Sequence, residues 1–231
     1  MTGTTVKAHG RLALMTQEKP MLGVRRRDAE RTRAELIEVA TEEFAERGYS
    51  GARVDEIADR TRTTKRMIYY YFGGKEQLYL AVLERAYAEI RAAERAVDVD
   101  HLDPIAAVRK LAEVTFDHHE AHPAFIKLVG VENAQHAKHM NHVAGLVDLN
   151  SSAVAVLGGI LERGVELGIF RSDVDALDVH MLISSFCFFR VANRHTFGAL
   201  FDRDLLDPAR RDFYRNMLGD LVTGYLRMKE D

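Results

Sequence analysis

Apolar residues recur at intervals of three and four along most of the chain, which is the spacing of an amphipathic helix. Residues 27–48 carry the first such stripe, and Gly48 stands where a helix-ending glycine is expected. This stripe consists of Ala34, Ile37, Ala40, Phe44 and Ala45. Two short helices are predicted over residues 54–60 and 64–72, separated by a polar break. A longer amphipathic helix is predicted to follow them over residues 75–95.

Long helices with short connections are predicted for the rest of the chain, which shows no alternating strand pattern and no internal repeat. Asp103 followed by Pro104 is typical of a capping residue and the first helical position. The predicted helices lie over residues 103–119, 123–143, 147–167, 173–197 and 207–228. With the four nearer the N-terminus, they predict an all-α protein of about nine helices. Residues 1–26 lack sustained periodicity and are predicted to form a flexible N-terminal arm.

Composition is typical of a folded protein from a reducing compartment. Hydrophobic residues make up 47% of the chain and only four residues are proline, which argues against disorder. The single cysteine, Cys187, lies in an apolar run, so a disulfide framework is excluded and a cytoplasmic location is expected. No uncharged apolar stretch is long enough to span a membrane, so neither a membrane partner nor a secretory signal is expected.

Charge is divided unevenly along the chain, whose formal net charge is −3. Residues 1–72 carry 14 Lys and Arg against 11 Asp and Glu, whereas the remainder carries 18 against 24. A mildly basic head followed by an acidic body favours contact with nucleic acid at the head alone.

Residues 53–75 contain the most informative pattern. Two short helices separated by a three-residue polar turn have the spacing of a helix-turn-helix. Their shared core is predicted to contain Val54, Ile57, Ala58, Ile68 and Phe72. Thr64 is placed to cap the second helix, with its hydroxyl and the first amides directed at a phosphate. The face predicted to enter the major groove presents Lys65, Arg66, Met67, Tyr69 and Tyr70.

An alternative is a small amphipathic hairpin with a solvated basic face. Three adjacent tyrosines at 69–71 argue against it, because Tyr69 and Tyr70 cannot both be buried on a helix that already buries Tyr71 and Phe72. Exposed phenols beside cations suit contacts to phosphates and bases. The pattern therefore favours DNA binding.

Residues 44–82 resemble the DNA-binding domain of the TetR family of transcription regulators. The resemblance rests on Gly48-Tyr49, the spacing of Val54, Ile57 and Ala58, the capped second helix, Tyr69-x-Tyr71-Phe72 and Lys75-Glu76-x-Leu78. It implies DNA contacts from Thr64, Lys65, Tyr69, Tyr70 and Lys75. The further candidate DNA-binding residues are Arg53, Thr63 and Arg66. Arg53 replaces the usual helix cap and is interpreted as a phosphate ligand, whereas Arg62 stands where the family commonly has a turn glycine.

By the same resemblance, residues 27–74 form the DNA-binding domain and residues 75–231 a ligand-binding and dimerisation domain. Candidate ligand contacts in this body are Phe116, His119, Phe125, Asn133, Phe186, Phe189, Arg190 and Asn193, although such residues are often ordinary core. The helices over 173–197 and 207–228 carry more apolar surface than one core-facing stripe needs, which favours a homodimer. A ligand-responsive repressor on a palindromic operator is therefore expected, without a cofactor; activation remains open.

Three other functions were weighed. No glycine-rich phosphate loop, nucleophile elbow or carboxylate pair stands out, so an enzyme is not expected. A DNA-bending protein without an effector would lack a cavity in its body. Histidines 119 and 122, and 136, 139 and 142, recur at intervals of three, which permits a shared metal ion. Pro123 interrupts the first pair and no cysteine joins them, so no metal is expected.

Overall fold

The computed structural model describes the backbone of residues 19–227 and the side chains of residues 27–227. This part of the chain folds into ten α-helices and two short 3-10 helices, which confirms the predicted all-α class. The elements are α1 (Lys19–Gly51), α2 (Val54–Arg60), α3 (Lys65–Phe72), α4 (Lys75–Arg95), α5 (Pro104–Ala121), α6 (Pro123–Ala134), η1 (Met140–His142), α7 (Leu146–Glu166), α8 (Ala176–Ala192), α9 (Arg194–Phe201), η2 (Pro208–Arg210) and α10 (Arg211–Leu226).

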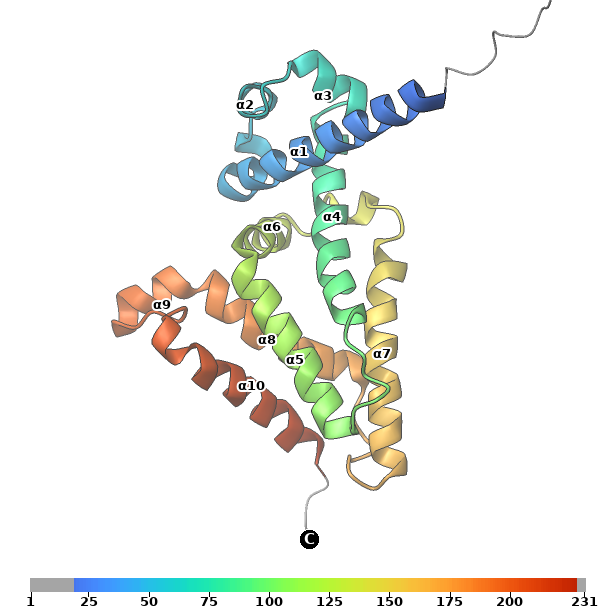
Figure 1. The fold of residues 1–231 in the computed structure, drawn as a ribbon. Helices are drawn as coiled ribbons and strands as arrows, with labels where there is room; N and C mark the ends of the chain where they lie inside the picture. The colour runs from blue at the N-terminus through green and yellow to red at the C-terminus, as the bar shows by residue number, and fades with distance from the viewer. Residues whose placement is uncertain (1–18, 228–231) are drawn as a thin grey trace, which may run out of the picture.

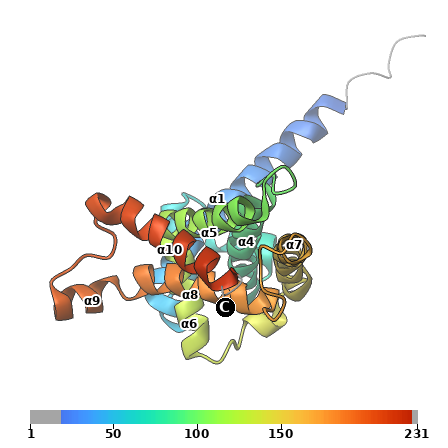
Figure 2. The same ribbon diagram turned by 90° about the horizontal axis from the view of Figure 1, so that it is seen from below.

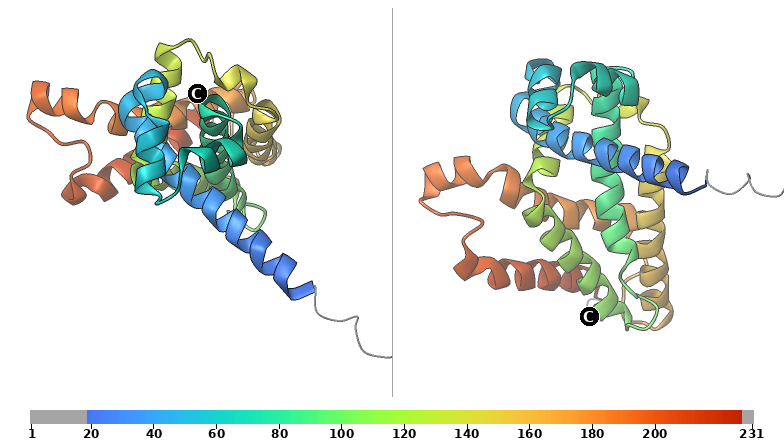
Figure 3. Two further views of the ribbon diagram at one scale, coloured as in Figure 1. Left: turned by 90° about the horizontal axis from the view of Figure 1, so that it is seen from above. Right: turned by 45° about the horizontal axis from the view of Figure 1, so that its top comes forward.

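Helices α1, α2 and α3 form a head at one end of the molecule, and α4 runs from this head into a helical body (Figure 1). In the body, α5, α7 and α8 pack against one another, and α10 packs along α5. Helix α9 lies at the tip of a projection on one side of the body (Figure 2). The view from above shows α2 and α3 side by side at the outer end of the head (Figure 3).

The core of the head combines one apolar face from each of its three helices. The residues predicted for this core in α2 and α3 are buried: Val54, Ile57, Ala58, Ile68 and Phe72. In α1 the buried stripe contains Leu36 in place of Ala34, so the prediction for Ala34 was wrong. The Ala34 side chain is exposed, and its carbonyl accepts a hydrogen bond from Arg85 (3.0 Å). The same apolar cluster includes Leu128 and Leu146 of the body. Head and body therefore share one core.

Helix α1 begins at Lys19. The flexible arm predicted over residues 1–26 was therefore wrong for residues 19–26, and residues 1–18 lie outside the described part. Pro20 is compatible with this start, because an amide in the first turn has no partner within the helix. At the other end Gly48 interrupts the helix with a φ of 66°, as its predicted role requires.

Two boundaries in the body differ from the prediction. Helix α6 ends at Ala134 rather than near residue 143, because the chain turns back and the amide of His139 donates to the Glu132 carboxylate (3.0 Å). The helix predicted over residues 173–197 is two helices, α8 and α9, which meet at Asn193. None of the described helices is both long and apolar enough to cross a membrane.

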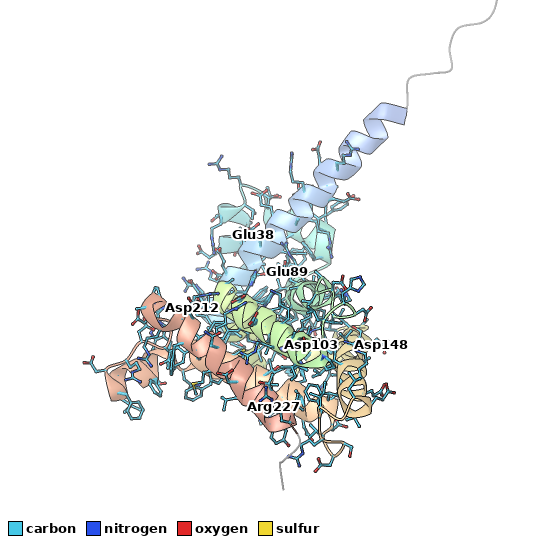
Figure 4. All side chains as sticks on the ribbon, turned by 60° about the horizontal axis from the view of Figure 1, so that its bottom comes forward. Glu38, Glu89, Asp103, Asp148, Asp212 and Arg227 are labelled. Carbon is cyan, nitrogen blue, oxygen red and sulfur yellow. The ribbon has the colours of Figure 1, made fainter. Side chains whose placement is uncertain are left out.

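The body is held together by a large apolar cluster among α5, α7, α8 and α10. Phe170 packs so closely against α7 that a side chain at Gly164 would clash with its ring. Figure 4 shows Glu89 of α4 between the head, marked by Glu38 on α1, and the start of α5, marked by Asp103. Helix α4 is thus the element that connects the head with the far end of the body.

Candidate nucleic-acid interface

Helix α3 is anchored on one side and presents its other side to solvent. Thr64 is its N-cap, and the Thr64 hydroxyl oxygen accepts a hydrogen bond from the amide of Met67 (3.4 Å), as predicted. Tyr69 is 47% exposed and Tyr70 is 76% exposed, whereas Tyr71 packs partly against the head core. Lys65 and Arg66 are also exposed. The outer face of α3 therefore combines two phenols with two cations, a set that suits phosphates and base edges.

The turn between α2 and α3 contains a strained backbone position. Arg62 has a φ of 51°, in the left-handed region that favours glycine. The turn is held on either side of it, because the Thr61 hydroxyl donates to the Ile57 carbonyl (2.8 Å) and the Thr63 amide donates to the Ala58 carbonyl (3.0 Å). Arg62 thus adopts the conformation of a turn glycine.

Glu43 of α1 organises the head, and sequence reasoning missed it. This carboxylate is 4% exposed, and its Oε1 accepts a hydrogen bond from the Arg53 amide (3.2 Å) at the start of α2. Arg47 lies 3.3 Å from the same oxygen, and Arg60 lies 4.0 Å from the other. Arg53 makes no side-chain cap for α2, and Glu43 of the neighbouring helix α1 instead accepts the amide of this N-cap residue. A glutamate among the buried positions of the first helical stripe is the sequence signal that could have revealed this role.

Two of the predicted contact residues are held by other groups in the free head. The Lys65 ammonium lies 3.1 Å from Asp55, and both side chains are exposed. The Lys75 ammonium lies 4.9 Å from the centre of the Tyr49 ring and donates to the Ser50 carbonyl (3.4 Å). Burial lowers the pKa of Lys75, and the negative charge of Glu43 opposes that shift. Lys75 is therefore held in one orientation, whereas Lys65 is paired with Asp55 at the exposed surface.

The eight predicted ligand contacts do not converge on one cavity. Asn133 and Phe189 are exposed. The Arg190 guanidinium lies 3.9 Å from the centre of the Phe116 ring and is paired with Glu120 (3.1 Å), so both residues belong to the core between α5, α8 and α10. The other four predicted contacts are His119, Phe125, Phe186 and Asn193. None of these four lines the small cavity that lies between α4, α5, α7 and α8. These residues come from different layers of the body, and their role in ligand binding remains a prediction.

A small enclosed cavity does lie in the body, between α4, α5, α7 and α8. Its volume is about 20 Å³. It is lined by Glu94, Arg95, Leu111, Thr115, Ala153, Val156, Leu157, His180 and Ile183. Buried polar residues cluster around one side of this cavity, on α4 and α5.

Comparison with known proteins agrees with this arrangement of a head and a helical body. Residues 36–82 match the family described as bacterial regulatory proteins, tetR family. Residues 104–222 match the family described as tetracyclin repressor-like, C-terminal domain. The chain belongs to the TetR family. It is therefore a DNA-binding transcriptional regulator and not an enzyme.

Curated TetR relatives are similar over much of their length. The HTH-type transcriptional repressor NicS of Pseudomonas putida is 35% identical over 205 residues, which cover 89% of this chain and 97% of that protein. The HTH-type transcriptional repressor SCO4008 of Streptomyces coelicolor is 34% identical over 140 residues, or 60% of this chain and 69% of that protein.

Solved structures of TetR regulators share the fold. The regulator SCO4942 from Streptomyces coelicolor superposes with a TM-score of 0.64 at 29% identity, over 82% of this chain and 97% of that one. The ketosteroid transcriptional regulator KstR2 of Mycobacterium tuberculosis superposes with a TM-score of 0.65 at 23% identity, over 85% of this chain and 95% of that one.

The TetR body of this chain exposes two apolar stripes. Along α8 the exposed residues are Leu177, Met181 and Phe189, and along α10 they are Phe213, Met217, Leu221 and Tyr225. The α10 residues recur every fourth position, so they line one side of the helix, while Leu218 and Val222 are buried on its other side. The apolar surplus predicted for these helices is thus divided between an inner and an outer face.

Several histidines of this TetR chain are held by contacts within the chain. His139 Nδ1 lies 2.9 Å from Glu132 Oε1, and the His118 ring stacks on His122 with ring centres 4.1 Å apart. Within the described residues, no three His, Cys, Asp or Glu side chains are grouped so that they could hold a metal ion.

Proposed function

We propose that this regulator is a repressor that binds a palindromic operator as a homodimer and leaves it when a small-molecule effector binds in the body. The observation that carries the proposal is α3, a capped helix locked onto the head by Ile68 and Phe72 with a polar outer face. NicS and SCO4008 are named repressors, which supports repression. Access to chromosomal DNA requires a cytoplasmic location.

The proposed DNA contacts come from the outer end of the head. They are Arg53, Thr63, Thr64, Lys65, Arg66, Tyr69, Tyr70 and Lys75. Thr64, Tyr69 and Lys75 would hold phosphates. Lys65, Arg66 and Tyr70 would reach base edges or the sugar-phosphate rim. Two copies related by a twofold axis place two α3 helices on successive major grooves, so half-sites lie about one or more helical turns apart.

The decisive experiment measures binding of the purified protein to the intergenic DNA upstream of its own gene, by fluorescence anisotropy at two salt concentrations. We expect saturable binding to one short palindrome that weakens as salt increases. Tyr70→Ala and Lys65→Ala are each expected to weaken binding by about 5- to 150-fold, the range for loss of one base contact. Lys127→Ala is the matched control, because Lys127 is exposed on α6 and remote from α3.

A folded wild-type protein that binds all DNA sequences equally would contradict sequence-specific regulation. So would Tyr70→Ala and Lys65→Ala variants that retain wild-type affinity, because the proposal places both side chains against DNA. Circular dichroism of each variant establishes that the helical fold is intact before the affinities are compared.

A further inference from the structure

Buried polar side chains are concentrated at one place in the body. They are Arg91 and Glu94 of α4, Thr115, His118 and His119 of α5, and His180 of α8, and we name them the polar cluster. All except His180 are less than 9% exposed. Burial of polar groups among apolar helices is unfavourable unless hydrogen bonds compensate for the lost water. The polar cluster therefore requires an explanation beyond packing.

Part of the polar cluster is internally satisfied. Arg91 Nη1 lies 2.7 Å from Glu94 Oε2, and the Thr115 hydroxyl donates to Glu94 Oε1 (3.3 Å). Among the described residues, however, Arg91 Nε and both ring nitrogens of His118, Nδ1 and Nε2, have no hydrogen-bond partner, whereas His119 interacts with the Thr115 backbone. Neutral imidazoles each carry one N–H donor, and a guanidinium carries only donors. The unused hydrogen-bonding capacity therefore includes several donors in a small volume.

The polar cluster adjoins the enclosed cavity, because Glu94, Thr115 and His180 also line it. The opposite wall is apolar and includes Leu157 and Ile183. At about 20 Å³ the cavity has room for roughly one water molecule. A larger ligand therefore binds only to a conformation in which these helices have moved apart, and its affinity biases the protein toward that conformation.

The charges favour an anionic ligand. Arg91 and Arg95 are positive and Glu94 is the only carboxylate among the cavity-lining residues and the polar cluster. The three histidines are neutral near pH 7, because burial lowers the pKa of His118 to about 3 and of His119 to about 4, and also lowers that of His180. A cationic ligand would have to compete with Arg91 for Glu94, whereas an anion meets a net positive site with unused donors.

We propose that the polar cluster and the adjoining cavity form an effector site for a small organic monoanion, a carboxylate on a compact apolar body. The carboxylate accepts hydrogen bonds from Arg91 and from the ring N–H group of His118, and the apolar body occupies the cavity between α5, α7 and α8. This assignment rests on the proposed function, in which an effector controls DNA binding. Of the ligand contacts expected from the sequence, this site includes only His119, as a member of the polar cluster.

The test uses three probes that share one ring and differ in charge: benzoate, benzamide and benzylamine. Binding to the full chain is followed by thermal shift and calorimetry, and by the ring nitrogen NMR signals of ¹⁵N-histidine-labelled protein. We expect benzoate to stabilise the protein and to shift the signals of His118 and His119, with benzamide weaker and benzylamine inactive. Equal or tighter binding of benzamide or benzylamine would overturn the proposal, as would absence of benzoate binding at millimolar concentration.

A paired substitution locates the site without leaving a single buried charge. The double variant Arg91→Met/Glu94→Gln removes both charges of the pair together, and it is expected to weaken benzoate binding at least tenfold. The matched control is Arg190→Met/Glu120→Gln, which removes the other buried arginine pair of the body, outside the cavity. The control should bind benzoate as the wild type does. Equal loss in both variants, or loss in neither, would refute the assignment.

These binding measurements do not involve DNA, so they separate the two proposals. Benzoate binding through Arg91 that leaves operator affinity unchanged would contradict effector-driven release while preserving the anion site. Operator release by benzoate that survives Arg91→Met/Glu94→Gln would preserve the regulatory function and contradict this site.

Discussion

At the residue scale, Glu132 shows how one side chain fixes a junction that no sequence pattern predicts. It is 0% exposed, and its carboxylate accepts hydrogen bonds from the Tyr79 hydroxyl (2.9 Å) and from the His139 amide (3.0 Å). Burial alone would raise the pKa of Glu132, but these hydrogen bonds and that from the Met140 amide outweigh it, and the pKa is lowered. The sequence showed His139 only as one of several regularly spaced histidines, because its partner is set by a turn that spacing does not reveal.

Arg62 provides a prediction at this scale. Its φ of 51° costs a residue with a Cβ about 1 kcal/mol or more relative to glycine. We expect Arg62→Gly to raise the free energy of unfolding by about 1 kcal/mol, measured by urea denaturation. Arg62→Ala is the matched control, because it removes the same charge and keeps the strain. Equal stability of the two variants would show that the backbone conformation is not what limits this turn.

At the scale of elements, the sequence predicted the head better than the body. The turn, the Thr64 cap and the exposed tyrosines of α3 depend on neighbours within a few residues, so their spacing specified them. Ligand contacts are harder to predict, because they depend on how α5, α6 and α8 are placed against one another. Apolar residues such as Phe116 and Phe125 look alike in sequence whether they line a cavity or fill a core.

Helices α8 and α10 carry the prediction about assembly. Their outer stripes present apolar side chains that a second copy would shelter in a four-helix bundle. We expect the wild type to sediment as a dimer and Leu221→Glu to sediment as a monomer with weaker operator binding, because each monomer contacts one half-site. Val147→Glu is the control, since Val147 is equally apolar and 79% exposed on α7. A monomeric wild type, or a dimeric Leu221→Glu, would argue against this interface.

At the scale of the whole molecule, α4 links the two proposed sites. It begins at Lys75, which faces the DNA-binding head, and it carries Arg91 and Glu94 of the polar cluster near its other end. The head core extends into the body through Leu128 and Leu146, so α4 cannot move without disturbing packing in both. A ligand that displaces α4 in the body therefore alters the position of the head, which is the coupling that effector-driven release needs.

The polar cluster also predicts how global stability depends on pH. His118 and His119 have pKa values of about 3 and about 4 in the folded chain, against an ordinary value of 6.5. For His118 the causes are burial first, then the neighbouring His122 and His119 and then Arg91. For His119 burial is again the largest cause, the hydrogen bond with the Thr115 backbone opposes it, and Arg91, His180 and His122 add to the lowering. At pH values between the folded pKa and the ordinary value of 6.5, the unfolded chain binds more protons than the folded chain. The free energy of unfolding therefore falls as the pH decreases below about 6.5.

Glu94 acts in the opposite direction, because burial raises its pKa and its protonation favours the folded chain. A variant therefore isolates the histidine contribution better than the wild-type curve does. We expect His118→Gln, which cannot titrate, to lose less stability than the wild type between about pH 7 and pH 4 in urea denaturation series. His195→Gln is the control, since His195 is exposed on α9 and should leave the curve unchanged. If His118→Gln follows the wild-type curve, His118 takes up its proton at the same pH in the folded and unfolded chains, which would contradict the burial-lowered pKa of this histidine.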